Sequence, residues 1–134
     1  MIIDAHIENL ALVLDFLRKE GQKIGMDKAA IQQLELATEE ALVNIIEHGY
    51  RDAPGKIEVL CEKVDGEFQV TLIDQAQSFD VQKAEVKHDP THPLQQRENG
   101  GLGILFMRKF TDRVEYSRVN DSNRLLLAKK ITSS

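Results

Sequence analysis

The stretch from Gln33 to Tyr50 reads Gln-Leu-Glu-Leu-Ala-Thr-Glu-Glu-Ala-Leu-Val-Asn-Ile-Ile-Glu-His-Gly-Tyr. It is rich in Ala, Leu and Glu and has neither Pro nor Gly before Gly49, which predicts a helix. Apolar residues recur here at steps of three or four, which is the spacing of a core-facing helix stripe. The members of the stripe are Ala30, Leu34, Ala37, Ala41 and Ile45. We therefore expect this helix to pack against the rest of the domain along these residues.

A line of polar residues runs beside the stripe, with Glu40, Asn44 and His48 each four positions after the last. Side chains four residues apart lie on one face of a helix, so these three can point into one cleft. A carboxylate, an amide and an imidazole at the edge of a buried face are unfavourable there unless they have partners. The line therefore marks a candidate site.

Length and composition bound the class of protein. A chain of 134 residues is one domain, large enough to bury a core, and its net charge of −5 argues against nucleic-acid binding. The single cysteine, Cys61, allows no intramolecular disulfide and is read as a small core residue rather than a nucleophile. No signal segment and no stretch long enough to span a bilayer is visible, so we expect a cytoplasmic protein without membrane contact.

The remaining pattern predicts the order of the elements. We expect a strand over 2–7, helices over 8–23 and 27–47, strands over 56–64 and 67–73, a helix over 102–110, and strands over 113–119 and 124–131. Gly21 and Gly25 are read as stop signals of the first helix, Asp27 as the N-cap of the second, and Gly49 as its C-terminal cap. Asp65-Gly66 and residues 120–123 are read as hairpin turns. This order predicts an α+β two-layer sandwich whose sheet is mostly antiparallel with helices on one face.

Residues 75–101 follow no helical or strand pattern, and the segment contains Pro90 and Pro93. A connection of this length inside a compact domain is usually a functional lid or a mobile loop. At its end, Asn99-Gly100-Gly101-Leu102-Gly103 opens the third helix. Free backbone N–H groups at a helix N-terminus suit a phosphate group, although a flexible hinge explains the glycines equally well. No P-loop and no protein-kinase signature is present.

The side-chain chemistry of Asp74, Asn44 and Glu40 gives each of them a candidate role. Asp74 ends an apolar strand and could accept a hydrogen bond from the amine of adenine, although an Asp commonly ends a strand by bonding to the next turn. Asn44 is a suitable oxygen ligand for Mg²⁺ when phosphates supply the remaining charge. Glu40, one turn away, could deprotonate an attacking hydroxyl. His48 is read as a packed or capping residue rather than a metal ligand.

Together these motifs resemble a known family. Residues 40–50 resemble the N-box helix of the Bergerat-fold ATPases, Asp74 to Phe79 is similar to their first glycine box, and Gly101-Leu102-Gly103 to their second. Within that superfamily the chain resembles the anti-sigma-factor serine/threonine protein kinases of bacterial stress and sporulation switches. The likeness extends to residues 8–11 and 107–116, and so covers nearly all of the chain.

The resemblance implies the histidine-kinase-like ATPase fold over residues 1–134, with ATP and Mg²⁺ as cofactors. It implies that Glu40 is the general base and that Asn44 binds Mg²⁺. It also implies that Asp74 accepts the adenine amine. The positions that it assigns to ATP binding are Asn44, His48, Asp74, Ala76, Phe79, Gly100, Gly101, Leu102 and Gly103. Such kinases phosphorylate a serine on an anti-anti-sigma antagonist and hold a sigma factor inactive, usually as homodimers, in a partner-switching module.

Ala76 departs from the family's pattern, because the first glycine box usually reads Asp-x-Gly. If φ is positive at this position, Ala costs on the order of 1–2 kcal/mol, whereas a negative φ makes it harmless. This departure motivates an alternative hypothesis, a switch protein of the same fold that sequesters a partner without phosphorylating it. The ATPase domain of a two-component histidine kinase is disfavoured, because no helical phosphoacceptor domain is present.

Overall fold

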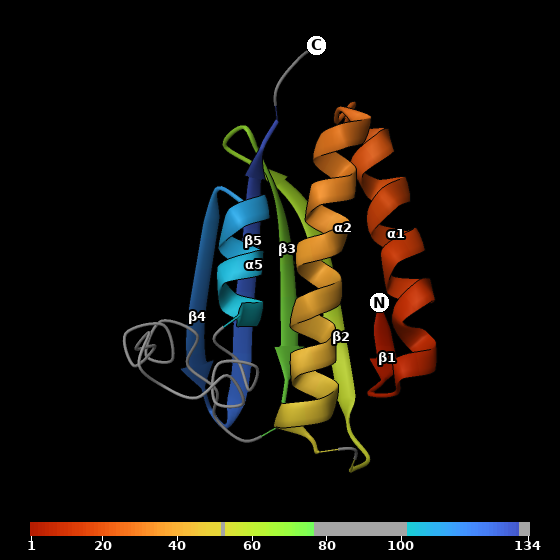
Figure 1. Cartoon of the computed structure of the whole chain (residues 1–134), viewed down its shortest axis with the longest axis vertical. Helices are drawn as coiled ribbons and strands as arrows, with labels where there is room; N and C mark the ends of the chain where they lie inside the picture. Colours follow the sequence, from red (N-terminus) through yellow and green to blue (C-terminus); the bar gives the residue numbers. More distant parts are fainter. Residues whose placement is uncertain (52, 77–101, 132–134) are drawn as a thin grey trace.

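The fold is that of a two-layer sandwich in a computed structural model, which describes residues 1–51, 53–76 and 102–131, with the backbone alone for 102–104. In chain order the elements are β1 (Ile2–Asp4), a 3-10 turn η1 (Ile7–Asn9), α1 (Leu10–Lys23), α2 (Lys28–Val43), a π-helical segment η2 (Asn44–Gly49), β2 (Lys56–Val64), β3 (Glu67–Asp74), α5 (Leu102–Phe110), β4 (Arg113–Val119) and β5 (Ser122–Lys130). Helix α2 lies between α1 and α5, and the three cover the same face of the sheet (Figure 1).

The sheet has the strand order β1-β2-β3-β5-β4, and all of these neighbours are antiparallel. The expected α+β sandwich with an antiparallel sheet is therefore confirmed. Asp65 and Gly66 both have positive φ, as a two-residue type I′ hairpin requires. Asn120 and Asp121 form a second turn of this kind, so β5 already begins at Ser122 and the predicted four-residue turn is too long.

The core lies between the helices and the inner face of the sheet. Along β3, buried residues alternate with partly exposed ones, as expected for a sheet with one covered face. The largest fully buried side chains come from α1, α2, α5 and three of the strands: Leu17, Leu34, Leu42, Ile57, Phe68, Leu72, Met107 and Leu127. Cys61 is half-buried at the edge of this core, and burial raises the pKa of its thiol to about 12. Its expected role as a packing residue therefore fits its surroundings.

The boundaries predicted for the elements nearest the N-terminus need correction. The strand expected over 2–7 ends at Asp4, and α1 begins at Leu10 after the 3-10 turn. Gly21 is not a stop signal, because it lies buried inside α1, where a Cβ would come within 3.0 Å of Ile31 Cγ1. Gly25 is the stop, with φ of +79°. Asp27 caps α2 as predicted, since its Oδ1 accepts a hydrogen bond from Ala29 N at 3.4 Å.

The end of the second helix differs most from its prediction. α2 ends at Val43 and continues as the π-helical segment η2, in which Tyr50 N donates to Ile45 O at 2.8 Å. The hydrogen bonds of a π turn span five residues instead of four, so the buried stripe steps from Ala41 to Ile46 and leaves the predicted Ile45 only partly buried. Gly49 is not a left-handed cap either, because the positive φ falls on Arg51.

None of the helices in the described ranges is long and apolar enough to cross a lipid bilayer.

Candidate functional site

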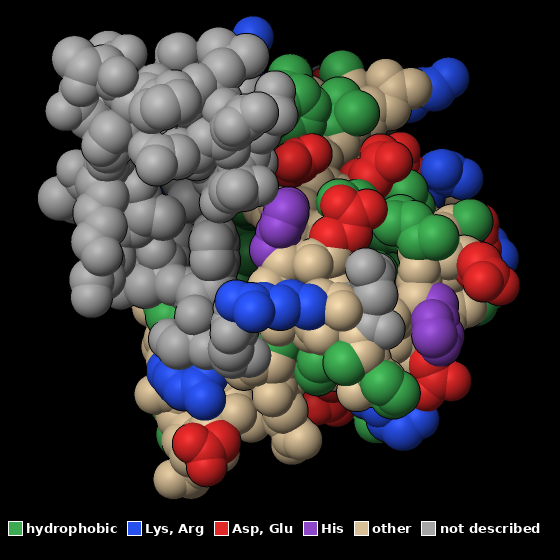
Figure 2. All heavy atoms as spheres, turned by 60° about the horizontal axis from the view of Figure 1, so that its bottom comes forward, with side chains coloured by type: hydrophobic (Ala, Val, Ile, Leu, Met, Phe, Trp, Pro, Cys, Tyr) green, Lys and Arg blue, Asp and Glu red, His purple; other side chains and the backbone are tan. Residues whose placement is uncertain are grey.

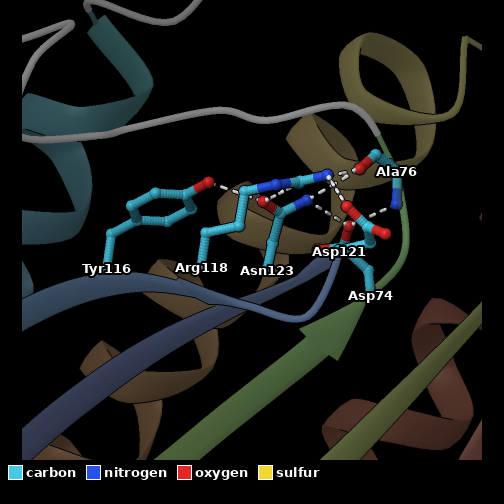
Figure 3. A network of polar contacts seen from close by, with 6 residues as sticks. All are labelled: Asp74, Ala76, Tyr116, Arg118, Asp121 and Asn123. Carbon is cyan, nitrogen blue, oxygen red and sulfur yellow. Dashed lines mark hydrogen bonds and ion pairs between the residues drawn. The ribbon is translucent and has the colours of Figure 1, made fainter.

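The carboxylate of Asp74 lies at the end of β3 and is only 4% exposed. Its Oδ1 accepts two hydrogen bonds of 2.9 Å, from the backbone N–H of Ala76 and from Nδ2 of Asn123 (Figure 3). Burial raises the pKa of Asp74, although these hydrogen bonds and the nearby charge of Arg118 act in the opposite direction. This residue is therefore a buried carboxylate held by the protein's own donors.

Asn123 is a residue of this site that the sequence reasoning missed. It faces Asp74 across the pairing of β3 with β5 and is 4% exposed. The prediction had assigned it to a turn, where an Asn is common. A signal was present, because Asn123, Leu125 and Leu127 alternate with Arg124 and Leu126 as the inward positions of a strand do.

Ala76, where the resemblance expects glycine, is accommodated without backbone strain. Four non-glycine residues in the described ranges have positive φ, and Ala76 is not among them. It is 6% exposed, and its carbonyl accepts hydrogen bonds from Asn123 Nδ2 at 3.0 Å and from an Arg118 guanidinium nitrogen at 3.3 Å. The penalty of about 1–2 kcal/mol for a left-handed Ala therefore does not arise.

The end of the second helix meets the end of β3 at Gly49. A Cβ built on Gly49 would lie 3.1 Å from the Cβ of Ala76, so the absence of a side chain permits this contact. Beside it, the hydroxyl of Tyr50 accepts from Gln75 N at 2.9 Å and donates to Lys56 O at 2.7 Å. These contacts bring the predicted helix site and the predicted strand site together.

Asn44, at the start of η2, is the buried member of the predicted polar line. It is 8% exposed, and its Nδ2 has no hydrogen-bond partner among the described residues. A buried polar group in this state costs about 1–3 kcal/mol, which a bound ligand can recover. Glu40 and His48 are half-buried. Figure 2 shows the face at this end of the sandwich, where acidic side chains lie beside the histidines in view.

The predicted glycine-rich turn at the start of α5 is described only in part. Leu102 and Gly103 form the first turn of α5, which begins where the sequence predicted. Phe79, Gly100 and Gly101, together with nearly all of the segment 75–101 expected as a lid, lie outside the described residues. Within the described ranges, no group of three or more His, Cys, Asp or Glu residues could hold a metal ion alone. A metal at Asn44 would need ligands from a bound molecule.

Comparison with known proteins gives one family and a set of relatives. The histidine kinase-like ATPase domain family matches residues 3–129. The serine-protein kinase RsbW of Bacillus licheniformis is 31% identical over 96 residues, which make up 69% of this chain and 60% of that protein. RsbW of Bacillus subtilis is 25% identical over 118 residues, or 85% of this chain and 74% of that protein. The chain thus spans between three fifths and three quarters of these two relatives.

A solved structure shares the fold. The RsbU and RsbW domains of a Mycobacterium tuberculosis protein superpose with a TM-score of 0.64 at 19% identity, and the match covers 98% of this chain and 32% of the other. At this identity the likeness shows the fold alone.

The contact between Gly49 and Ala76 can be tested with a double-mutant cycle. Gly49→Ala should lower the free energy of unfolding by about 1–3 kcal/mol, because the two methyl groups compete for one space. Ala76→Gly in the same chain should restore the space, giving a coupling of roughly 1 kcal/mol in urea denaturation. Gly25→Ala is the matched control, since no atom of the described residues beyond its chain neighbours lies within 4 Å of its added Cβ, and it should not couple to Ala76→Gly. Additivity of the Gly49 and Ala76 changes would contradict the contact.

The buried carboxylate predicts a pH dependence of stability. The pKa of Asp74 is raised in the folded state, so the folded protein binds this proton more tightly and loses stability as pH rises above the unfolded value of 3.8. Asp74→Asn keeps an oxygen for both donors and removes the charge. The melting temperature of the variant should therefore exceed that of the wild type near neutral pH, by a margin that shrinks as the pH falls toward 4. A margin that is constant with pH, or that grows on acidification, would contradict the raised pKa.

Proposed function

The chain belongs to the histidine kinase-like ATPase domain family, and we propose that it is an ATP- and Mg²⁺-dependent serine/threonine protein kinase that doubles as an anti-sigma factor. The observation that carries the proposal is the contact of η2 with the end of β3, at Gly49 and Ala76. With this contact, the buried side chains of Asn44, whose Nδ2 has no partner among the described residues, and of Asp74 lie at one end of the sandwich. The kinase activity of the RsbW relatives supports the assignment.

ATP would lie between these two groups. Both hydrogen bonds that the described residues donate to Asp74 go to Oδ1, and Oδ2 receives none from them. Asp74 would therefore accept a hydrogen bond from the adenine amine through Oδ2. Asn44 would bind Mg²⁺ through its amide oxygen together with the phosphates, and its Nδ2, which has no hydrogen-bond partner among the described residues, could donate to a ligand oxygen. The N-terminus of α5 would face the phosphates. The other ATP-binding positions in the proposal are His48, Ala76, Phe79, Gly100, Gly101, Leu102 and Gly103.

Glu40 would act as the general base. It lies one helical turn before Asn44 and is half-buried, so its carboxylate can face the space in which the phosphates bind. It would take the proton of a serine hydroxyl as the serine oxygen bonds to the γ-phosphorus and the bond from that phosphorus to the bridging oxygen breaks, releasing ADP. Bound Mg²⁺ would neutralise charge that develops on the phosphate oxygens.

Exchanging Glu40 tests the reaction. Glu40→Gln should lower labelling of the antagonist's serine by labelled ATP by roughly 100-fold or more, because proton transfer is lost. ATP binding measured by calorimetry should stay largely intact. The exposed neighbour provides a matched control, since Glu39→Gln should label at the wild-type rate. Normal labelling by the Glu40 variant would remove it from the mechanism, and no ATP binding by the wild type would favour the alternative of a non-phosphorylating switch protein.

The proposed partners follow from the same assignment. The substrate would be a small anti-anti-sigma antagonist, the second partner a sigma factor or another switch target, and the kinase a homodimer. Because the two partners would compete for one kinase, nucleotide state would bias the choice between them.

A pull-down from native cytosol, with and without ATP, tests this switch. The tagged chain should recover both an antagonist and a sigma factor, in proportions that change when ATP is added. A matched pull-down with the Glu40→Gln variant should retain the antagonist in the presence of ATP, because it cannot be phosphorylated and released. Recovery of neither partner would contradict partner switching while leaving the kinase chemistry to the labelling experiment.

A further inference from the structure

The side-chain amide of Asn123 both accepts and donates hydrogen bonds. Its Oδ1 accepts hydrogen bonds from the hydroxyl of Tyr116 and from a guanidinium nitrogen of Arg118, the latter at 2.8 Å. Its Nδ2 donates to Asp74 Oδ1 at 2.9 Å and to the carbonyl of Ala76 at 3.0 Å (Figure 3). Both hydrogens of the amide and both lone pairs of its oxygen are therefore used.

The neighbours of Asn123 decide which end of the amide faces Asp74. A guanidinium group can only donate, so the atom 2.8 Å from Arg118 has to be the amide oxygen. The NH₂ group is then directed at Asp74 and Ala76. The reversed amide would set its NH₂ against the Arg118 donor and its oxygen against the Asp74 carboxylate and the Ala76 carbonyl. The orientation is therefore imposed by three groups from outside the amide.

This arrangement also decides which oxygen of Asp74 is available. Oδ1 is occupied by two N–H donors, from Ala76 and Asn123, whereas Oδ2 accepts no hydrogen bond from the described residues. Two donors on one oxygen hold the carboxylate against rotation. Asp74 can thus offer a single acceptor, in a set direction, to anything that binds beside it.

We propose that Asn123 is a positioning residue that sets the purine specificity of the site through Asp74. The inference rests on the proposed ATP site. Adenine carries an amine donor on the edge where guanine and hypoxanthine carry a carbonyl acceptor. An acceptor held by Asn123 bonds to the amine and is repelled by the carbonyl. The choice of base therefore depends on a side chain one hydrogen bond removed from the nucleotide.

The same geometry predicts that the Asp74→Asn variant reverses the preference between a base with an amine and a base with a carbonyl. In Asp74→Asn, the N–H donors of Ala76 and Asn123 would still require an oxygen at the position that Oδ1 of Asp74 holds in the wild type. The new amide would consequently direct its NH₂ group toward the base. A donor in that place suits a carbonyl, so this variant should prefer a base that carries one. When Asn123 is also removed, only the Ala76 N–H remains to orient the amide, and the preference should weaken.

The test compares dissociation constants for ATP and inosine triphosphate, measured by calorimetry on the full chain. The wild type should bind ATP roughly tenfold more tightly or better, the effect of one hydrogen bond to a charged group. Asn123→Leu should lower this ratio by roughly fivefold or more. Asp74→Asn should bring it below one, and the double variant should return it toward one. Ser117→Ala, an exposed change on β4, is the control and should keep the wild-type ratio.

A ratio separates positioning from folding, because partial unfolding weakens the binding of both nucleotides equally. Thermal melts establish that each variant is folded, and the near-isosteric Asp74→Asn provides a second test if Asn123→Leu is unstable. A wild type that binds ATP while Asn123→Leu keeps the wild-type ratio, or Asp74→Asn keeps its preference for ATP, overturns the role of Asn123 alone. A wild type that binds neither nucleotide overturns the proposed function and this inference with it.

Discussion

The buried carboxylate of Asp74 is the constraint on which one end of this molecule depends. A charged group removed from water has to be solvated by the protein, and here the donors come from the next turn and from a neighbouring strand. That requirement explains a polar Asn123 at an inward position of β5 and the Tyr116 and Arg118 side chains that satisfy its oxygen. The last hairpin, far away in the chain, is therefore a structural part of the candidate nucleotide site.

Local signals predicted most of the fold, and non-local packing accounts for the errors. Asp65-Gly66 predicts the β2–β3 hairpin because both residues tolerate positive φ. Gly21 was misread because its use is steric: it lets α1 approach Ile31, which no local rule can indicate. The step from Ala41 to Ile46 was missed because a 3.6-residue period was assumed through a π turn. Within the candidate site, the helix and strand residues could be predicted from local pattern, whereas Asn123 becomes visible only once β5 is paired with β3.

The departure at Ala76 has a steric answer. Glycine at such a position provides either a positive φ or room for a close approach. The backbone of Ala76 needs no positive φ, and the room is provided on the other side of the contact by Gly49. The pair thus contains one glycine, at the end of the helix rather than at the end of the strand. Ala76 therefore gives no structural reason to expect that the site has lost its nucleotide.

The π turn shifts the helical phase between α2 and η2. Up to Val43 the helix repeats every 3.6 residues, and its angular positions are set by packing against α1, α5 and the sheet. After the turn the positions are offset by one residue, so Ile46 anchors a new phase that carries Gly49 and Tyr50 to the end of β3. One extra residue thus determines which side chains the end of the helix presents to the end of β3.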